Sequence, residues 1–255
     1  DHTSVTLWID GVEVLVDSGH AGYRDATLRE GLREPQAHNV LLLPDVQFGI
    51  RQPTEHTRSN AGPGWRFDEV QDRVYGFQAG TIVDDPRTRG VLMLPDDGVM
   101  VVNDRASRAE FGAFEQLWHL LPGSTEVSRR RGAVVFRHPT APVDVHLIQV
   151  PLPGQQLERG ASTVVTGQTS PLLGWFAETE GDRQAAPVAR FRRFGTSTQM
   201  VTVVTTTPRG ATAAAAATRA DGGWLVSLDR AGATRDRRCW LHRVAHRPRA
   251  ARGRA

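Results

Sequence analysis

Short runs in which apolar and polar residues alternate dominate the chain, and pairs of turn residues separate them. At residues 5–9 every second side chain is apolar, so these side chains fall on one face of an extended strand. Asp10-Gly11 follows, and residues 12–16 form a second alternating run. An Asp-Gly pair between two such runs indicates a hairpin, because a type I′ turn needs positive φ at both central residues.

The same pattern recurs along the chain. Alternating runs flank turn residues at 90–94 with 99–103, at 126–129 with 133–137, and at 213–218 with 224–228, and residues 143–150 and 200–207 are further expected strands. Repeated hairpins with little helical periodicity are typical of antiparallel sheets. The sequence therefore predicts an all-β fold, an antiparallel β-sandwich or set of stacked sheets built from hairpins.

Residues 105–121 are compatible with either an amphipathic helix or a strand that starts at Phe111. Gly112 lies in the middle of this segment, and glycine costs roughly 1 kcal/mol relative to alanine in a helix interior. We therefore expect a strand.

Charge divides the chain into two parts. All 31 basic residues are Arg, and residues 235–255 hold eight of them with one Asp, whereas the whole chain carries only +3. The rest of the chain is therefore acidic overall. We expect one β domain over residues 1–230 and an Arg-rich, disordered tail over residues 231–255. The tail has no recognisable reading motif for bases, so we do not expect nucleic-acid binding.

Several functional classes are excluded by what the sequence lacks. No apolar run reaches the roughly 20 residues of a membrane-spanning helix, so membrane insertion is not expected. Cys239 is the single cysteine, which excludes an internal disulfide framework. The sequence has no G-x-S-x-G motif, no P-loop and no dinucleotide-binding glycine pattern.

Residues 17–39 form a long polar segment rich in glycine and proline between two apolar runs, and loops of this length are often functional. Asp17 ends one run and His38 precedes the next. A carboxylate and an imidazole suit zinc, but zinc takes about three or four protein ligands. From spacing alone we favour a structural reading, in which Asp17 caps the turn before Gly19 and His38 bonds a backbone carbonyl.

A second candidate pair is Asp144 and His146, which share one face of an expected strand. The two side chains could bind a metal, but the pattern favours an exposed polar strand face. His119 follows Trp118 in an apolar stretch and is expected to be a hydrogen-bonded core residue.

Residues 1–48 are similar to the heparinase II/III-like family of polysaccharide lyases. The family pattern is an HxD-like motif, an apolar strand ending in Asp-x-Gly, a loop with Tyr and Arg, Ala-His-Asn before a strand, and a Gln. The matching positions are Asp1, Asp17 with Gly19, Tyr23 with Arg24, Ala37-His38-Asn39, and Gln47. The resemblance extends more diffusely to about residue 207.

The resemblance implies the C-terminal β-sheet domain of a lyase that cleaves uronate-containing acidic polysaccharide, heparin/heparan- or alginate-like, by β-elimination. In the family an N-terminal α/α toroid precedes this domain and supplies most of the acid and base residues. We therefore expect no catalytic residue in this chain, which by itself would be inactive, and we expect the missing toroid of the same parent chain as its partner. Family members are exported, which implies the cell envelope, the periplasm or secretion.

The resemblance also implies a zinc ion held by Asp17 and His38. The third ligand, the His of the HxD-like motif, would lie just before Asp1, because His2 is out of register with it. We therefore expect a chain truncated at its N-terminus that binds zinc poorly.

The resemblance further implies that Tyr23, Arg24 and Asn39 contact substrate, although a packed loop is an equal reading for Tyr23 and Arg24. Two other functions stay open. One is a non-catalytic carbohydrate-binding or structural β-domain, and the other is an unrelated β-sandwich whose basic tail contacts anionic surfaces.

Overall fold

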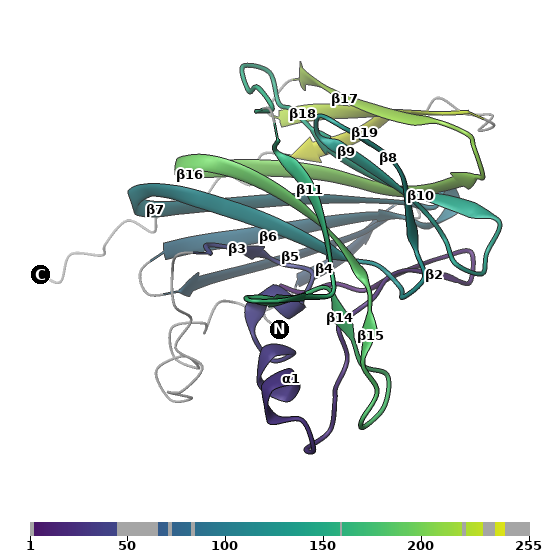
Figure 1. The fold of residues 1–255 in the computed structure, drawn as a ribbon. Helices are drawn as coiled ribbons and strands as arrows, with labels where there is room; N and C mark the ends of the chain where they lie inside the picture. Colours follow the sequence, from purple (N-terminus) through teal and green to yellow (C-terminus); the bar gives the residue numbers. More distant parts are fainter. Residues whose placement is uncertain are drawn as a thin grey trace, which may run out of the picture.

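The computed structural model describes residues 3–44, 66–70, 73–82, 85–158, 160–220, 223–231 and 238–242. A ten-stranded antiparallel sheet dominates this part of the chain (Figure 1). Its main path runs through β4 (Arg66–Val70), β5 (Arg73–Ile82), β6 (Asp85–Leu94), β7 (Val99–His119), β16 (Pro187–Pro208), β10 (Val143–Val150), β9 (Ala133–Arg137) and β8 (Thr125–Arg130). Beside this path, β3 (Leu41–Leu42) pairs with β7 and β11 (Ser162–Thr166) pairs with β16. The predicted all-β fold is confirmed.

Strands β7 and β16 are the longest and pair from Val188 opposite His119 to Thr205 opposite Val99. The register shifts once, between Gly195 and Ser197, so the ladder carries a bulge at its middle. Bulges bend the strand that holds them, and both strands curve at the left of the view in Figure 1. Because of this bend, two stretches of each strand line one shared core. Residues 105–119 are strand, as expected, but the strand begins at Val99 rather than at Phe111.

Short elements complete the fold. They are β1 (Leu7–Ile9) with β2 (Val12–Leu15), α1 (Ala26–Gly31), η1 (Pro35–Ala37), η2 (Pro95–Asp97), β12 (Gln168–Thr169) with β13 (Leu172–Leu173), and β14 (Trp175–Phe176) with β15 (Gln184–Ala185). Asp10 and Gly11 have φ values of 50° and 76°, so the predicted positive-φ hairpin is confirmed. No helix within the described ranges has the length and hydropathy needed to cross a bilayer.

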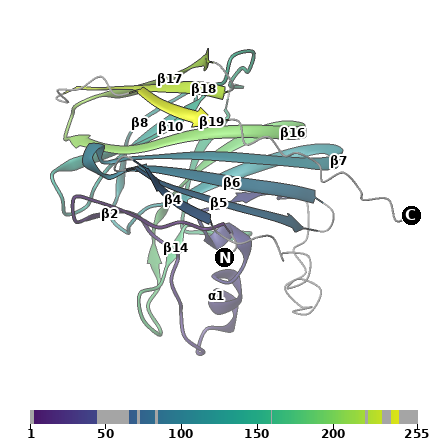
Figure 2. The ribbon, with the colours of Figure 1, turned by 180° about the vertical axis from the view of Figure 1, so that it is seen from behind.

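A three-stranded sheet covers one outer face of the large sheet (Figure 2). It consists of β17 (Ala213–Ala220), β18 (Gly223–Arg230) and β19 (Arg238–His242). Small side chains of β17 pack with Val226 against a cluster that includes Val101 and Val203 of the large sheet. Residues 238–242, which lie within the predicted tail, form β19 and pair with β18. The rest of residues 232–255 lies outside the described residues.

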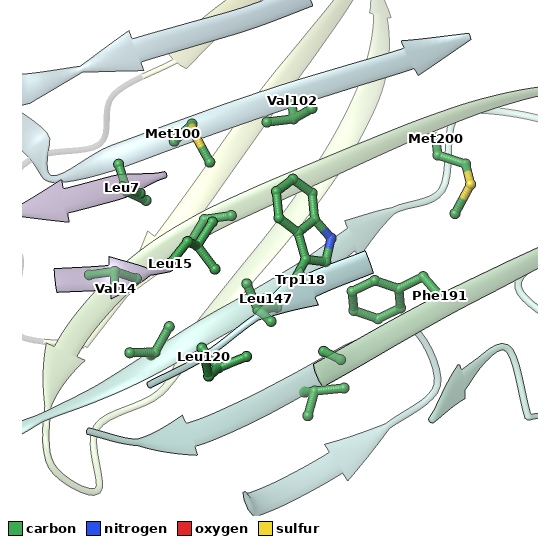
Figure 3. Packing of buried hydrophobic residues seen from close by; sticks show 14 of the residues in the cluster. Leu7, Val14, Leu15, Met100, Val102, Trp118, Leu120, Leu147, Phe191 and Met200 are labelled. Carbon is green, nitrogen blue, oxygen red and sulfur yellow. The ribbon is translucent and has the colours of Figure 1, made fainter. Parts of the chain in front are cut away.

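The main hydrophobic core lies on the opposite face of the large sheet. Trp118 of β7 is fully buried there and packs in one cluster with Leu15, Leu147 and Phe191, which come from three other strands (Figure 3). Burying a side chain of this kind contributes roughly 1.5–3 kcal/mol. Apolar packing therefore fixes the β1–β2 hairpin to the sheet. The hairpin is followed by residues 17–39, which we call the candidate loop.

A buried ion pair crosses this core. The Arg89 guanidinium donates from Nε to Asp104 Oδ1 at 2.7 Å and from Nη2 to Asp104 Oδ2 at 2.6 Å, and both residues are 1% exposed. Its Nη1 also donates to the carbonyl oxygens of Thr3, at 2.7 Å, and of Asn39. Gln116 donates to Asp104 at 2.6 Å. One side chain of β6 thus holds the N-terminal segment, the end of the candidate loop and β7 together.

We predict that Arg89→Met lowers the free energy of unfolding by about 3–5 kcal/mol, because it leaves the Asp104 carboxylate buried without its cation. Denaturant unfolding measures this change. The matched control is Arg129→Met, since Arg129 pairs with Glu126 at the surface at 3.3 Å, and such pairs contribute about 0–1 kcal/mol. Equal effects of the two substitutions would contradict the proposed importance of the buried pair.

Candidate functional site

The loop that joins β2 to β3 is attached at both ends to the last residues of β7. Val16 N–H donates to the His119 carbonyl at 3.1 Å, and Leu117 N–H donates to the Val40 carbonyl at 2.9 Å. Two strand ends that are distant in sequence therefore lie side by side. Between them the loop contains α1, which begins after Asp25, whose side chain accepts from Leu28 N–H at 2.8 Å.

The loop also runs beside the end of β14. His20 N–H donates to the Ala177 carbonyl and Ala177 N–H donates to the Ser18 carbonyl, each at 3.0 Å. Gly19 lies at this contact with a φ of 79°, and a Cβ there would come within 2.1 Å of the Ala177 oxygen. Only glycine fits this close approach without a backbone shift.

Asp17 and His38, the two residues expected to ligate zinc, do come together. His38 Nδ1 lies 2.7 Å from Asp17 Oδ2, and Asp17 Oδ1 accepts from Gly19 N–H at 3.1 Å. The His38 side chain is 5% exposed and that of Asp17 is 38% exposed. Burial alone would raise the pKa of Asp17, but the hydrogen bond and charge of His38 outweigh it and the pKa is lowered. The expected Asp17 turn before Gly19 is confirmed, whereas the His38 ring bonds Asp17.

A second histidine lies beneath this pair. His119 Nδ1 is 3.2 Å from Ser18 Oγ, and its Nε2 is 3.1 Å from the Gln36 carbonyl oxygen. A carbonyl only accepts, so Nε2 carries the proton and Nδ1 accepts from the hydroxyl. Burial lowers the pKa of His119 to about 4, with Asp17 opposing the shift, so the ring is neutral at pH 7. His119 is the hydrogen-bonded core residue that its sequence context predicted.

Asn39 has a different role from the one expected. Its side chain is fully buried, and Nδ2 donates to the carbonyl oxygens of Val5 and Val16, each at 2.8 Å. Its Oδ1 accepts from His119 N–H at 2.6 Å. A side chain that is enclosed and used in this way cannot contact a polysaccharide. We therefore reassign Asn39 from substrate contact to a structural role that ties three backbone segments together.

Tyr23 and Arg24 are exposed, as a substrate contact requires, and Tyr23 is 74% exposed. The Arg29 guanidinium lies 4.6 Å from the centre of the Tyr23 ring, and the His20 ring packs edge-on at 5.9 Å. Tyr23 N–H donates to the Glu180 carboxylate at 3.2 Å. Sequence reasoning named His20 among the polar residues of this loop but did not single out Arg29, which lies six residues after Tyr23 on α1. Gln47 lies outside the described residues.

The described residues do not complete a zinc site. Asp17 and His38 are of the right chemical types, but nowhere in the described ranges do three His, Cys, Asp or Glu side chains gather as a metal site needs. A further donor would have to come from outside the described residues.

Asp144 and His146 are not the exposed pair that the strand pattern favoured, since they are 1% and 3% exposed. Asp144 accepts from Arg137 Nε at 3.2 Å and from Gly210 N–H at 2.7 Å, while His146 Nε2 lies 2.8 Å from Thr207 Oγ1. The exposure prediction was wrong because the β17–β19 sheet covers this face.

Comparison with known proteins gives both a family and a fold. The sequence profile described as "Heparinase II/III-like, C-terminal" matches residues 1–252, which reaches into the predicted tail. No curated protein matches the chain significantly. Among solved structures, the heparan sulfate lyase HepC from Pedobacter heparinus superposes with a TM-score of 0.72 at 14% identity, over 93% of this chain and 36% of that one. A heparinase III superposes with a TM-score of 0.67 at 15% identity, over 93% and 35%. The chain thus spans about a third of the length of these lyases and shares their fold.

We predict that Asn39→Ala lowers the free energy of unfolding by about 3 kcal/mol or more. It leaves two buried carbonyls and one buried N–H without partners, at about 1–3 kcal/mol for each unsatisfied group. Chemical denaturation followed by circular dichroism measures the change. The control is Asn103→Ala, at a partly exposed asparagine, which should cost about 1 kcal/mol. A loss for Asn39→Ala no larger than this would return Asn39 to the candidates for substrate contact.

We also predict that stability falls as the pH drops from about 6.5 to 4. The unfolded chain protonates His119 near the ordinary pKa of 6.5, whereas the folded chain does so only near 4. The unfolded state therefore binds more protons in this window, and the contribution of His119 is complete above pH 6.5. The loss at the acid end is about 3 kcal/mol at 1.36 kcal/mol per pKa unit.

Urea unfolding at a series of pH values tests this dependence. His119→Gln should flatten the curve between pH 4 and 6.5, while His20→Gln, at an exposed histidine, should leave it unchanged. The same pH dependence in both variants would show that His119 is not the group responsible.

Proposed function

Because the chain belongs to the heparinase II/III-like, C-terminal family, we propose that it is the β-sheet domain of a polysaccharide lyase that cleaves uronate-containing acidic polysaccharide. The observation that carries the proposal is the family match over residues 1–252. The Asp17–His38 contact, brought together from the two ends of one loop, adds a local feature in the region that resembles the family most closely. Heparan sulfate, heparin and alginate are the polymers we propose as substrates.

The proposed reaction is β-elimination. A base removes the proton at C5 of a uronate, the C4–C5 double bond forms, and the C4–oxygen bond breaks while an acid protonates the departing oxygen. A positive group near the uronate carboxylate stabilises the negative charge that develops. We place the acid and base on an N-terminal toroid domain outside this chain, so the chain alone is inactive.

This chain would contribute binding. Tyr23 presents an exposed ring with the half-buried Arg29 guanidinium beside it, and Arg24 adds an exposed cation. Guanidinium groups pair well with carboxylate and sulfate. These side chains belong to the same loop as Asp17 and His38, so they would hold the polymer against the domain that carries the acid and base.

We further propose that the parent protein binds zinc through Asp17 and His38, with a third ligand from a residue that precedes Asp1. A bound zinc ion would supply positive charge next to the loop and fix its conformation. We propose an extracytoplasmic location, in the cell envelope, the periplasm or the medium, where a polymer of this size is accessible.

A non-catalytic carbohydrate-binding domain is the second candidate. It is favoured by one observation, namely that Tyr23 and Arg24 are exposed on the loop and so are available to bind an acidic sugar. In that case the domain would bind acidic sugar without any elimination.

The test uses the parent protein, extended upstream to include the toroid domain and the third ligand. We predict ultraviolet absorbance from the unsaturated product on at least one of heparan sulfate, heparin and alginate. His38→Ala should lower kcat/KM at least tenfold and reduce the zinc content measured by elemental analysis.

Arg24→Ala should raise KM by about threefold to tenfold with little change in kcat, because it removes a binding contact that the ground state and transition state share.

The matched control is Arg131→Ala, an exposed arginine in the β8–β9 turn, which should leave both constants unchanged. No product from any of these polymers, with the protein folded and still binding them, would favour the second candidate. Normal zinc content in His38→Ala would refute the proposed ligand.

A further inference from the structure

The bend of the large sheet exposes two phenylalanines. Phe111 on β7 is 73% exposed and Phe194 on β16 is 47% exposed. They flank Gly112 and Gly195, which lie opposite each other directly before the register shift. A large apolar side chain that stays in water contributes nothing to the core, so a pair of them marks a surface with another use.

The two rings form one surface. Their centroids are 6.5 Å apart and their planes differ by 11°, so they are nearly parallel. Phe194 pairs with Ala113, two residues from Phe111, which places both rings on the same face of the β7–β16 ladder. We call this pair, together with Arg190, Arg192 and Glu115, the corner platform.

The platform carries excess positive charge. Arg192 lies on the same strand face as Phe194, with its guanidinium carbon 6.0 Å from the ring centre. Arg192 Nε donates to Glu115 Oε1 at 2.6 Å, and Arg190 Nη1 lies 3.9 Å from the same oxygen. Two guanidinium groups therefore share one carboxylate, so Arg190, Arg192 and Glu115 together carry one net positive charge.

We propose that the corner platform is a second binding site for acidic polysaccharide, separate from the Asp17–His38 loop. Aromatic rings accept the apolar C–H face of a pyranose, and a guanidinium pairs with the carboxylate or sulfate that such a polymer carries on its sugars. The polymer class rests on the proposed function.

The two sites are spaced for one polymer to reach both. The Asp17–His38 loop is attached at His119, eight residues along β7 from Phe111. At about 3.3 Å per residue of strand this separates them by roughly 26 Å. A polymer held at the platform is present at a high effective concentration near the loop, so the two weak sites bind more tightly together than either does alone.

The experiment uses the 255-residue chain and measures its affinity for immobilised heparan sulfate and alginate, with dextran as the neutral polymer. We expect the double variant Phe111→Ala/Phe194→Ala to bind at least one acidic polymer tenfold or more weakly than the unchanged chain does. Neither the unchanged chain nor the double variant should bind dextran. Trp8→Ala is the matched control, because Trp8 is 59% exposed on β1, and it should bind like the unchanged chain. All three truncations are at exposed positions, so thermal unfolding should be close to that of the unchanged chain.

Three results would overturn the proposal. One is unchanged affinity in the double variant, and another is the absence of any binding to acidic polymers by the unchanged chain. The third is a loss of binding together with a fall in mass by sedimentation, because that would identify the platform as a contact between two copies. Failure of the lyase assay on the parent protein would refute the proposed reaction but leave this binding measurement intact, so the two failures are distinguishable.

Discussion

The structure depends on the way the buried guanidinium of Arg89 is neutralised. A guanidinium enclosed in an apolar core is tolerated only when carboxylate and carbonyl oxygens surround it. Arg89 meets this condition with Asp104 from β7 and with backbone carbonyls of Thr3 and Asn39, which belong to segments outside the regular sheet. The need to satisfy the cation therefore fixes where these two irregular segments lie.

The candidate site follows from that constraint. Arg89 bonds the carbonyl of Asn39, and the side chain of Asn39 bonds the carbonyls of Val5 and Val16. Asn39 thereby also fixes the segment before β1 and the end of β2. Asp17 directly follows Val16, and His38 directly precedes Asn39. The side chains of Asp17 and His38 therefore lie close together, with His38 Nδ1 2.7 Å from Asp17 Oδ2. Their contact is the outer end of a chain of buried polar interactions. A change far below the surface is thus expected to alter the geometry of the loop.

Local sequence patterns predicted the parts of the fold that depend on neighbouring residues. The positive φ values at Asp10 and Gly11 and the hairpin pairs follow from turn chemistry and a two-residue period. The meeting of Asp17 with His38 came from the resemblance to a known family, because spacing alone favoured a structural reading. The burial of Asn39, Asp144 and His146 was not predictable, since it depends on which segments cover them, and those segments are distant in the sequence.

The bend of β7 and β16 belongs to the same class of long-range features, and it explains why the corner platform exists. A sheet that folds around its own core brings the side chains of its inner face together and spreads those of its outer face apart. Phe114 and Phe191, on the inner face, are fully buried by this curvature, whereas Phe111 and Phe194, on the outer face, cannot be covered by neighbouring strands of the same ladder. Their exposure is therefore a geometric consequence of the bulge, and the core gains nothing from their size. Smaller or polar residues would serve the fold equally well at these two positions, so a ligand is the better physical account of two parallel rings beside the Arg192 guanidinium.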